Sequence, residues 1–178
     1  TDHDNRFREV AWSPDGSKLV TASQDTTMKI WDYASRKIIR TIQGHDILTT
    51  ISWSPDGRFI AYGNMEGSGA NFNSESIMMI LEIDILRKAA ELNVDRVFWS
   101  PDGSMIAGET EAGVLIWDTS TWENLLTLEG QTAPVAWSPD GTRLATYQDG
   151  EIVFWGVSED GLSSMSESVA SEVPGNEG

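Results

Sequence analysis

The feature that most constrains the fold is a short segment that recurs along the chain. The tetrapeptide Ser-Pro-Asp-Gly occurs four times, and Trp precedes it each time. The four copies are Trp12–Gly16, Trp53–Gly57, Trp99–Gly103 and Trp137–Gly141. They recur with a period of roughly 40 residues, which is typical of proteins that stack one small structural unit several times.

The chemistry of the repeated segment predicts a hairpin turn. Pro fits the second position of a type I turn because its ring fixes φ near −65°. Ser and Asp can hydrogen-bond to the local backbone, and Gly supplies the positive φ that ends such a turn. The predicted turn residues are Pro14, Asp15 and Gly16, Pro55, Asp56 and Gly57, Pro101, Asp102 and Gly103, and Pro139, Asp140 and Gly141.

Alternating apolar residues around the turn predict an all-β fold. In the first repeat we expect strands over 7–12, 18–23, 28–32 and 36–42. Four strands per repeat and a period near 40 predict the four-stranded antiparallel blades of a β-propeller. Fourth strands are expected at about 37–42, 87–92 and 124–128, and none is evident after Trp155. The sequence thus predicts three complete blades and one that lacks a strand.

Two dipeptides connect these repeats with a known family. Trp31-Asp32 and Trp117-Asp118 resemble the Trp-Asp pair of WD40 repeats, and Gly44-His45 resembles the Gly-His element of the same family. The resemblance covers roughly residues 3–156. It implies a ring of blades around a central channel, which presents rigid surfaces to other proteins and carries no catalytic residues in most members.

The resemblance also implies a structural set of hydrogen-bonded residues in the first repeat. By position these are His3, Ser23, Asp25 and Trp31. A His between a hydroxyl and a carboxylate would satisfy both ring nitrogens, and a buried indole N–H needs an acceptor. Ser, His and Asp also occur together in hydrolases, but no Gly-x-Ser-x-Gly segment is present. We therefore expect a structural role.

The other repeats depart from the family pattern, so this set is complete only once. Repeat two also resembles TolB-type propellers through Phe59-Ile60-Ala61-Tyr62, which keeps a hydrolase or ligand-binding module as an alternative. The departures are Gly63 and Leu81-Glu82 in repeat two, Glu109 and Glu111 in repeat three, and Gln131 and Trp155-Gly156 in repeat four.

Seven of the eight tryptophans occupy two repeated positions, before the turn or on a third strand. The exception is Trp122, at the predicted start of a fourth strand. Such regular placement predicts packing between blades rather than an aromatic ligand cage.

We expect two segments, a propeller part over 1–156 and a disordered acidic Ser/Glu/Gly tail over 157–178. An alternative is that Gly161 to Ala170 supplies the missing outer strand. The repeats are expected at about 3–44, 45–92, 93–129 and 130–156. About four blades fit an arc of a larger ring, completed by further blades in the same chain, but self-association or a small closed ring are alternatives.

Composition restricts the partners. The formal net charge is −16, which disfavours nucleic acid and anionic membranes. The chain has no Cys and two His, so a zinc site is not expected, and we expect no metal and no cofactor. No apolar run approaches the roughly 20 residues of a membrane span. We expect a soluble protein, with the cytoplasm slightly favoured.

These patterns predict a non-catalytic scaffold that binds other proteins. The Gly-, Asn- and Ser-rich segment Asn64–Ser76 reads as a long loop and is the expected contact surface. A propeller hydrolase would need clustered acids, for which Glu109, Glu111, Glu66 and Glu75 are the candidates. A third alternative is a sensory segment attached to an unseen catalytic domain.

Overall fold

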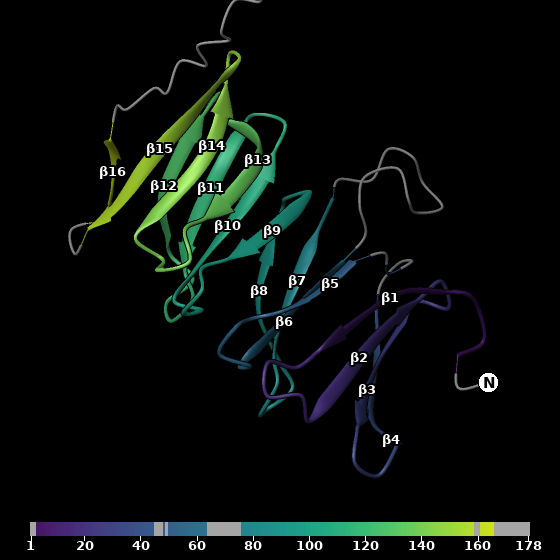
Figure 1. The fold of residues 1–178 in the computed structure, drawn as a ribbon. Coiled ribbons are helices and arrows are strands. Elements are labelled where there is room, and N and C mark those ends of the chain that lie inside the picture. The colour runs from purple at the N-terminus through teal and green to yellow at the C-terminus, as the bar shows by residue number, and fades with distance from the viewer. Residues whose placement is uncertain (1–2, 45–47, 49, 64–75, 159–160, 166–178) are drawn as a thin grey trace, which may run out of the picture.

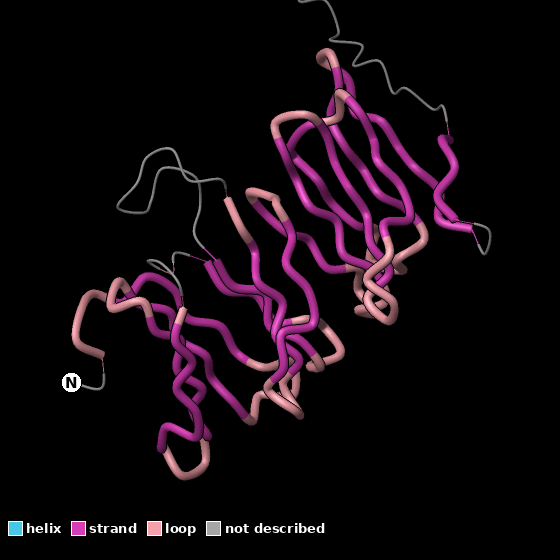
Figure 2. The backbone as a smooth tube through the Cα atoms, turned by 180° about the vertical axis from the view of Figure 1, so that it is seen from behind, coloured by secondary structure: helices cyan, strands magenta, loops and turns pink. Residues whose placement is uncertain are grey.

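A computed structural model describes residues 3–44, 48, 50–63, 76–158 and 161–165. All regular structure in this part of the chain is β, as the backbone trace in Figure 2 shows. The strands form four separate antiparallel sheets of four strands, and each sheet follows the order of the sequence. The predicted all-β architecture of four-stranded blades is confirmed.

Each blade begins with the strand that leads into a Ser-Pro-Asp-Gly turn. Blade 1 contains β1 (Phe7–Trp12), β2 (Lys18–Ser23), β3 (Thr27–Asp32) and β4 (Lys37–Gln43). Blade 2 contains β5 (Thr50–Trp53), β6 (Phe59–Gly63), β7 (Met78–Glu82) and β8 (Arg87–Leu92).

The second pair of blades repeats this order. Blade 3 contains β9 (Arg96–Trp99), β10 (Met105–Thr110), β11 (Gly113–Asp118) and β12 (Asn124–Glu129). Blade 4 contains β13 (Thr132–Trp137), β14 (Arg143–Gln148), β15 (Glu151–Ser158) and β16 (Gly161–Met165).

The outer strand of blade 4 corrects two predictions. We predicted no fourth strand after Trp155 and a disordered tail from 157, but β15 runs to Ser158 and pairs with β16. The alternative that a segment from Gly161 supplies the outer strand is correct for 161–165. The five residues Gly-Leu-Ser-Ser-Met show no alternation of apolar and polar side chains, and the strand is defined by its backbone pairing with β15. Residues 166–178 lie outside the described residues.

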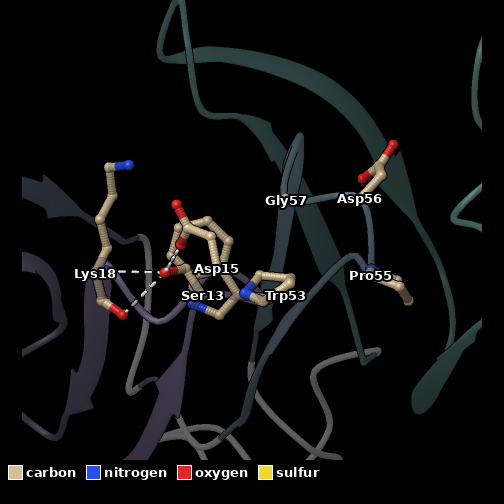
Figure 3. A pocket seen from close by; sticks show the side chains of 8 residues that line it. Ser13, Asp15, Lys18, Trp53, Pro55, Asp56 and Gly57 are labelled. Atoms are coloured by element: carbon tan, nitrogen blue, oxygen red, sulfur yellow. Dashed lines mark hydrogen bonds between the residues drawn. The ribbon is translucent and has the colours of Figure 1, made fainter.

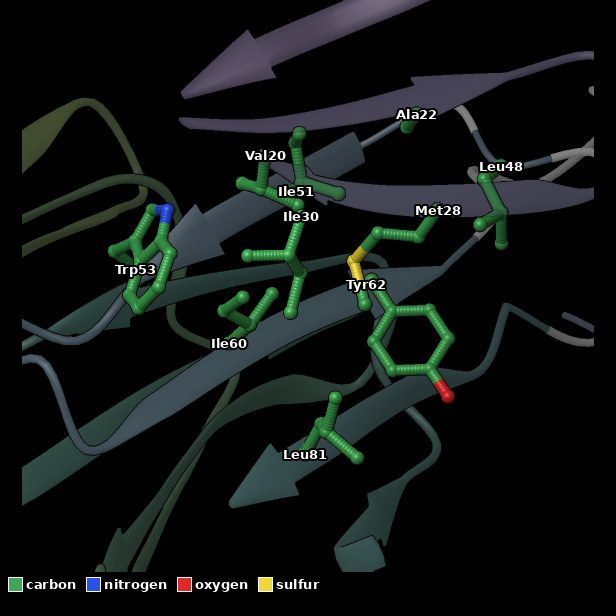
Figure 4. Close-up of a cluster of buried hydrophobic side chains, with 10 residues drawn as sticks. All are labelled: Val20, Ala22, Met28, Ile30, Leu48, Ile51, Trp53, Ile60, Tyr62 and Leu81. Atoms are coloured by element: carbon green, nitrogen blue, oxygen red, sulfur yellow. The ribbon is translucent and has the colours of Figure 1, made fainter. Parts of the chain in front are cut away.

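The core lies between the blades rather than within one sheet. We call the face of a blade toward the next blade in sequence its forward face, and the opposite one its rear face. Figure 4 shows the first core, where Val20, Met28 and Ile30 on the forward face of blade 1 meet the rear face of blade 2. The rear face contributes Ile51, Trp53, Ile60, Tyr62 and Leu81. Burying each large apolar side chain stabilises the fold by about 1.5–3 kcal/mol.

The same arrangement joins the remaining blades. A second buried cluster connects the forward face of blade 2 with the rear face of blade 3, and a third connects blade 3 with blade 4. Alternation along each strand sends successive side chains to opposite faces, so every internal blade contributes to two cores. This explains why the strands of the middle blades are apolar on both faces.

The four blades lie side by side, with blade 1 and blade 4 at opposite ends (Figure 1). The sheets do not close into a ring over the described residues. Trp12, on the rear face of blade 1, is 51% exposed, whereas its equivalent Trp53 in blade 2 is 8% exposed. Ile152, on the forward face of blade 4, is 49% exposed, whereas Met28 at the same position of blade 1 is fully buried. The two ends of the row therefore expose the faces that neighbouring blades cover.

Candidate functional site

The four repeated turns have the same geometry. In each, the Gly N–H donates to the Ser carbonyl at 2.9 Å, which closes the turn. The Ser hydroxyl donates to the Asp carboxylate at 2.5–2.7 Å, and the backbone N–H two residues after Asp donates to that carboxylate at 3.0 Å. Gly16, Gly57, Gly103 and Gly141 have φ between 69° and 75°, as predicted.

The turn carboxylates are held as acceptors by their own turns. Hydrogen bonds from the Ser138 hydroxyl and the Thr142 backbone N–H lower the pKa of Asp140 to about 2. The same kinds of hydrogen bond, first from the Ser13 and Ser100 hydroxyls, hold the pKa values of Asp15 and Asp102 below their ordinary range. A group that stays ionised and is bonded to its own turn stabilises the turn and is poorly suited to proton transfer.

Two neighbouring turns enclose a pocket of about 310 Å³ between blades 1 and 2 (Figure 3). Its lining consists of Ser13, Pro14, Asp15 and Lys18 from blade 1, and Trp53, Pro55, Asp56 and Gly57 from blade 2. Both carboxylates in this lining accept hydrogen bonds from their own turns. The pocket is therefore a consequence of how two turns stack.

The structure brings three of the four predicted tetrad residues together around a fourth that the sequence did not identify. The His3 ring lies with Nδ1 2.8 Å from Asp25 Oδ2 and Nε2 2.8 Å from Thr21 Oγ1. The Trp31 indole N–H donates to the same Thr21 hydroxyl at 3.0 Å. Because a carboxylate only accepts, Nδ1 is the donor, and a ring with one proton accepts from Thr21 at Nε2.

Ser23 was predicted to supply that hydroxyl, and this assignment is wrong. The Ser23 hydroxyl donates to the Arg6 carbonyl at 3.1 Å and accepts from the Asp25 backbone N–H at 3.1 Å. Thr21 and Ser23 lie two positions apart on one strand and point to the same face, so alternation does not distinguish them. The position along β2 determines which hydroxyl is used, because Thr21 lies within reach of both His3 and Trp31.

Asp25 completes this network. Burial raises the pKa of Asp25, but hydrogen bonds from Thr27, His3 and Asp4 outweigh it, and the pKa lies far below its ordinary value. The His3 side chain is fully buried. The Thr21 hydroxyl is buried as well, and Trp31 occupies it as a donor. A buried hydroxyl engaged in this way is not accessible as a nucleophile, which supports a structural role for the set.

Blade 4 contains a second polar network that the sequence did not reveal. The Trp155 indole donates to the Thr146 hydroxyl at 2.9 Å, and this hydroxyl donates to Gln131 Oε1 at 2.5 Å. The Gln131 amide in turn donates to Gln148. The sequence places Gln131 where His stands in the family pattern. Thr21 and Thr146 lie at the same distance after their turns, and this shared spacing is the signal that could have identified the Thr hydroxyl in both networks.

Among the described residues, the two middle blades fill the same place mainly with apolar groups. In blade 2, Leu48, Tyr62 and Leu81 belong to one buried cluster. In blade 3, Gly108 stands where Thr21 stands, and a Cβ there would lie 2.7 Å from both the Trp117 ring and Val94. The departures from the tetrad in these blades are therefore replacements of hydrogen bonds by close packing.

The candidate acids of a hydrolase do not form a cluster among the described residues. Glu109 forms an ion pair with Arg96 at 3.1 Å between Oε2 and Nε. Glu111 is exposed in the turn that joins β10 and β11. Glu66 and Glu75 lie outside the described residues, as does the predicted contact loop Asn64–Ser76 apart from Ser76 itself. The described part of the chain contains no group of three His, Cys, Asp or Glu placed to hold a metal ion.

The described residues include no helix long and apolar enough to cross a membrane.

Trp122 was predicted at the start of a fourth strand. It lies instead in the turn before β12, with φ of 61°.

Comparison with known proteins identifies the family to which the repeats are similar. A model described as "WD domain, G-beta repeat" matches residues 1–32, 36–68 and 122–156, which together form more than half of the chain. The third turn, Trp99–Gly103, lies outside these matches, yet the structure forms a blade there with the same strand order. Sequence divergence in blade 3 therefore leaves its architecture unchanged.

Three curated proteins are similar, two of them over three quarters of the chain. Protein HIR1 of Candida albicans is 28% identical over 150 residues, which is 75% of this chain and 16% of that protein. The WD repeat-containing protein AAC3 of Dictyostelium discoideum is 29% identical over 140 residues, covering 75% of this chain and 28% of AAC3. A ribosome biogenesis protein BOP1 homolog of Drosophila mojavensis is 35% identical over 66 residues, 37% of this chain and 8% of its own length. The chain thus spans less than a third of these relatives.

Proposed function

Because the chain belongs to the WD40 repeat family, we propose that it serves as a protein-interaction scaffold and carries no catalytic site of its own. The relatives are proteins with several different names, which supports a shared scaffold rather than one shared partner. The formal net charge of −16 favours partners with basic surfaces, because opposite charges accelerate encounter.

The observation that carries this proposal is the use of the reactive side chains as internal supports. His3, which would be the base of a hydrolase, is bonded at both ring nitrogens to Asp25 and Thr21. The hydroxyl beside it is buried and is bonded to Trp31. Each turn carboxylate is bonded to its own turn. Such groups hold the backbone of the blades rigid, which is what a binding surface needs.

The proposal includes the expected loop Asn64–Ser76 as one contact surface. It connects the second and third strands of blade 2, where blade 4 has only the short turn at Asp149 and Gly150. Insertions between strands of a rigid sheet are common places for binding residues. A matched pair of variants is therefore available, one at each of two equivalent connections.

The test is affinity capture of the tagged full-length protein from its native cell, followed by quantitative mass spectrometry. We expect a reproducible set of captured proteins, of which at least one is lost when 64–75 is replaced by a Gly/Ser segment of equal length. Asp149→Gly, at the equivalent turn of blade 4, should leave the set unchanged because Asp149 already has a positive φ. An unchanged set after replacement removes the loop from the proposal, and the absence of any specific protein refutes the scaffold.

A further inference from the structure

A second pocket between blades 1 and 2 lies near their outer strands. It has a volume of about 320 Å³. Ile30 and Ile39 of blade 1 and Ile83 and Leu86 of blade 2 supply apolar walls. The volume is in the range of small-ligand and side-chain pockets. Ile85, next to this lining, is 59% exposed. The β7–β8 turn thus presents apolar side chains to solvent beside an apolar pocket.

The equivalent place between blades 2 and 3 is filled by the chain itself. Phe59 and Trp122 meet there edge to face, with ring centroids 5.2 Å apart and an angle of 86° between the ring planes. Both rings pack in the buried cluster that joins these two blades, together with Ala89. An indole ring against a phenyl ring therefore fills the space that is open between blades 1 and 2.

The correspondence of the two places follows from the strand register. Lys18 and Phe59 hold the same place after their turns, because the backbone N–H of each donates to the hydroxyl oxygen of the turn Ser. Leu86 and Trp122 lie in equivalent turns before the outer strand, and both have a positive φ, 49° and 61°. Lys18 and Leu86 therefore replace the two rings, and neither supplies an aromatic group.

The lining of the open pocket contains two cations and one carboxylate. Lys18 and Arg40 line it, where the filled place has Phe59 and Ala90, and Asp84 is the one carboxylate in the lining. Ala90 pairs with Ile80 in the same register as Arg40 with Ile30. Arg40 donates to the carbonyl of its neighbour Ile39 at 2.7 Å. Two cations on the walls of an apolar pocket suit an aromatic ring, by cation–π contact, and a carboxylate beside it.

We propose that this pocket docks an aromatic side chain of a partner protein, with an acidic residue next to it in the partner's sequence. The inference deepens the scaffold function proposed above and rests on it. The aromatic ring takes the place that Trp122 occupies between blades 2 and 3. The acidic neighbour binds near Lys18 and Arg40. Recognition is local on a chain that is strongly negative elsewhere, so the acidic residue selects this pocket over the remaining surface.

The probe is a fluorescently labelled, blocked pentapeptide with a central tryptophan between two glutamates, titrated into the full-length protein and followed by anisotropy. We expect saturable binding that weakens at least tenfold when the tryptophan is replaced by alanine. Exchange of the glutamates for lysines should weaken binding severalfold. Equal binding of the lysine peptide, or no saturable binding up to millimolar concentration, overturns the proposal.

Variants locate the site. Leu86→Trp combined with Lys18→Phe recreates the filled arrangement of blades 2 and 3, and it should abolish binding while circular dichroism and the thermal midpoint show an intact fold. Arg40→Ala should weaken binding severalfold. Lys37→Ala removes the same charge from the same strand outside the pocket lining and should have no effect. If the peptide still binds the Leu86→Trp, Lys18→Phe variant, the proposal is overturned. If the full-length protein captures partners from its native cell but does not bind the peptide, the pocket proposal fails and the scaffold function stands.

Discussion

Gly103, the turn glycine of blade 3, lies directly against Asp56 in the turn of blade 2. A Cβ at position 103 would be 2.9 Å from the Asp56 carboxyl carbon and 3.2 Å from both its oxygens. Gly103 also has φ of 74°. Two independent constraints thus exclude a side chain here, one from the backbone and one from the neighbouring blade.

Gly103→Ala is therefore expected to destabilise the protein more than Gly16→Ala. Both substitutions place a Cβ at positive φ, which costs about 1–2 kcal/mol. Gly16 has no atom within 4 Å of that Cβ, whereas Gly103 meets Asp56. The contact should add about 1–3 kcal/mol. Urea unfolding of both variants measures the difference, and equal free energies of unfolding would show that Asp56 moves aside freely.

Thr21→Val is expected to disrupt the His3 network, while Ser23→Ala leaves it in place. The valine removes the partner of His3 Nε2 and of the Trp31 indole, and it should cost about 2–4 kcal/mol. Thr21→Ser keeps the hydroxyl and is the control. The indole proton of Trp31, observed by NMR, should shift in Thr21→Val alone. A shift of similar size in Ser23→Ala would restore the original assignment of that serine.

Trp137→Phe and Trp99→Phe should differ although both residues precede a turn. The Trp137 indole donates to the Phe98 carbonyl at 3.0 Å. The buried Trp99 indole N–H has no hydrogen-bond partner among the described residues. Losing the bond should cost about 1 kcal/mol more in Trp137→Phe than in Trp99→Phe. Thermal unfolding compares the two, and a larger loss at position 99 would contradict this account.

The lowered pKa of Asp25 makes the free energy of unfolding depend on pH in the acidic range. The folded-state pKa lies below the unfolded value of about 3.9, so the ionised form stabilises the fold above that value. This contribution is lost as pH falls from about 5 through the folded pKa. Unfolding free energies at pH 7 and pH 3.5 should therefore differ less in Asp25→Asn than in the unsubstituted protein. An identical pH dependence in both would rule out Asp25 as a contributor.

Local features of the sequence predicted the blades well. The turn needs only Ser, Pro, Asp and Gly in order, and its hydrogen bonds involve residues no more than five positions apart. Alternation predicts the strands on either side of the turn. The outer strand of blade 2, farther from the turn, was also predicted at its observed bounds, Arg87–Leu92. Information of this kind lies within a few residues of the chain.

Contacts between blades could not be predicted in the same way. Whether Phe59 meets Trp122 depends on two segments some sixty residues apart in sequence and on the register of two blades. The choice of Thr21 over Ser23 depends on where the chain before β1 places His3. The strand β16 lacks an alternation of apolar and polar side chains, so its pairing with β15 was not evident from the sequence. Each of these features depends on the three-dimensional arrangement of distant segments, which the pattern of the sequence does not contain.

The local character of the turns affects the order in which the protein folds during synthesis. A hairpin held by hydrogen bonds over five residues forms in about 1–10 μs. A ribosome adds about 5–20 residues per second, so the next blade follows only after several seconds. During that interval the forward face of a completed blade, with Val20, Met28 and Ile30, remains bare. Each newly made blade thus offers a nascent-chain chaperone an apolar surface until its successor emerges.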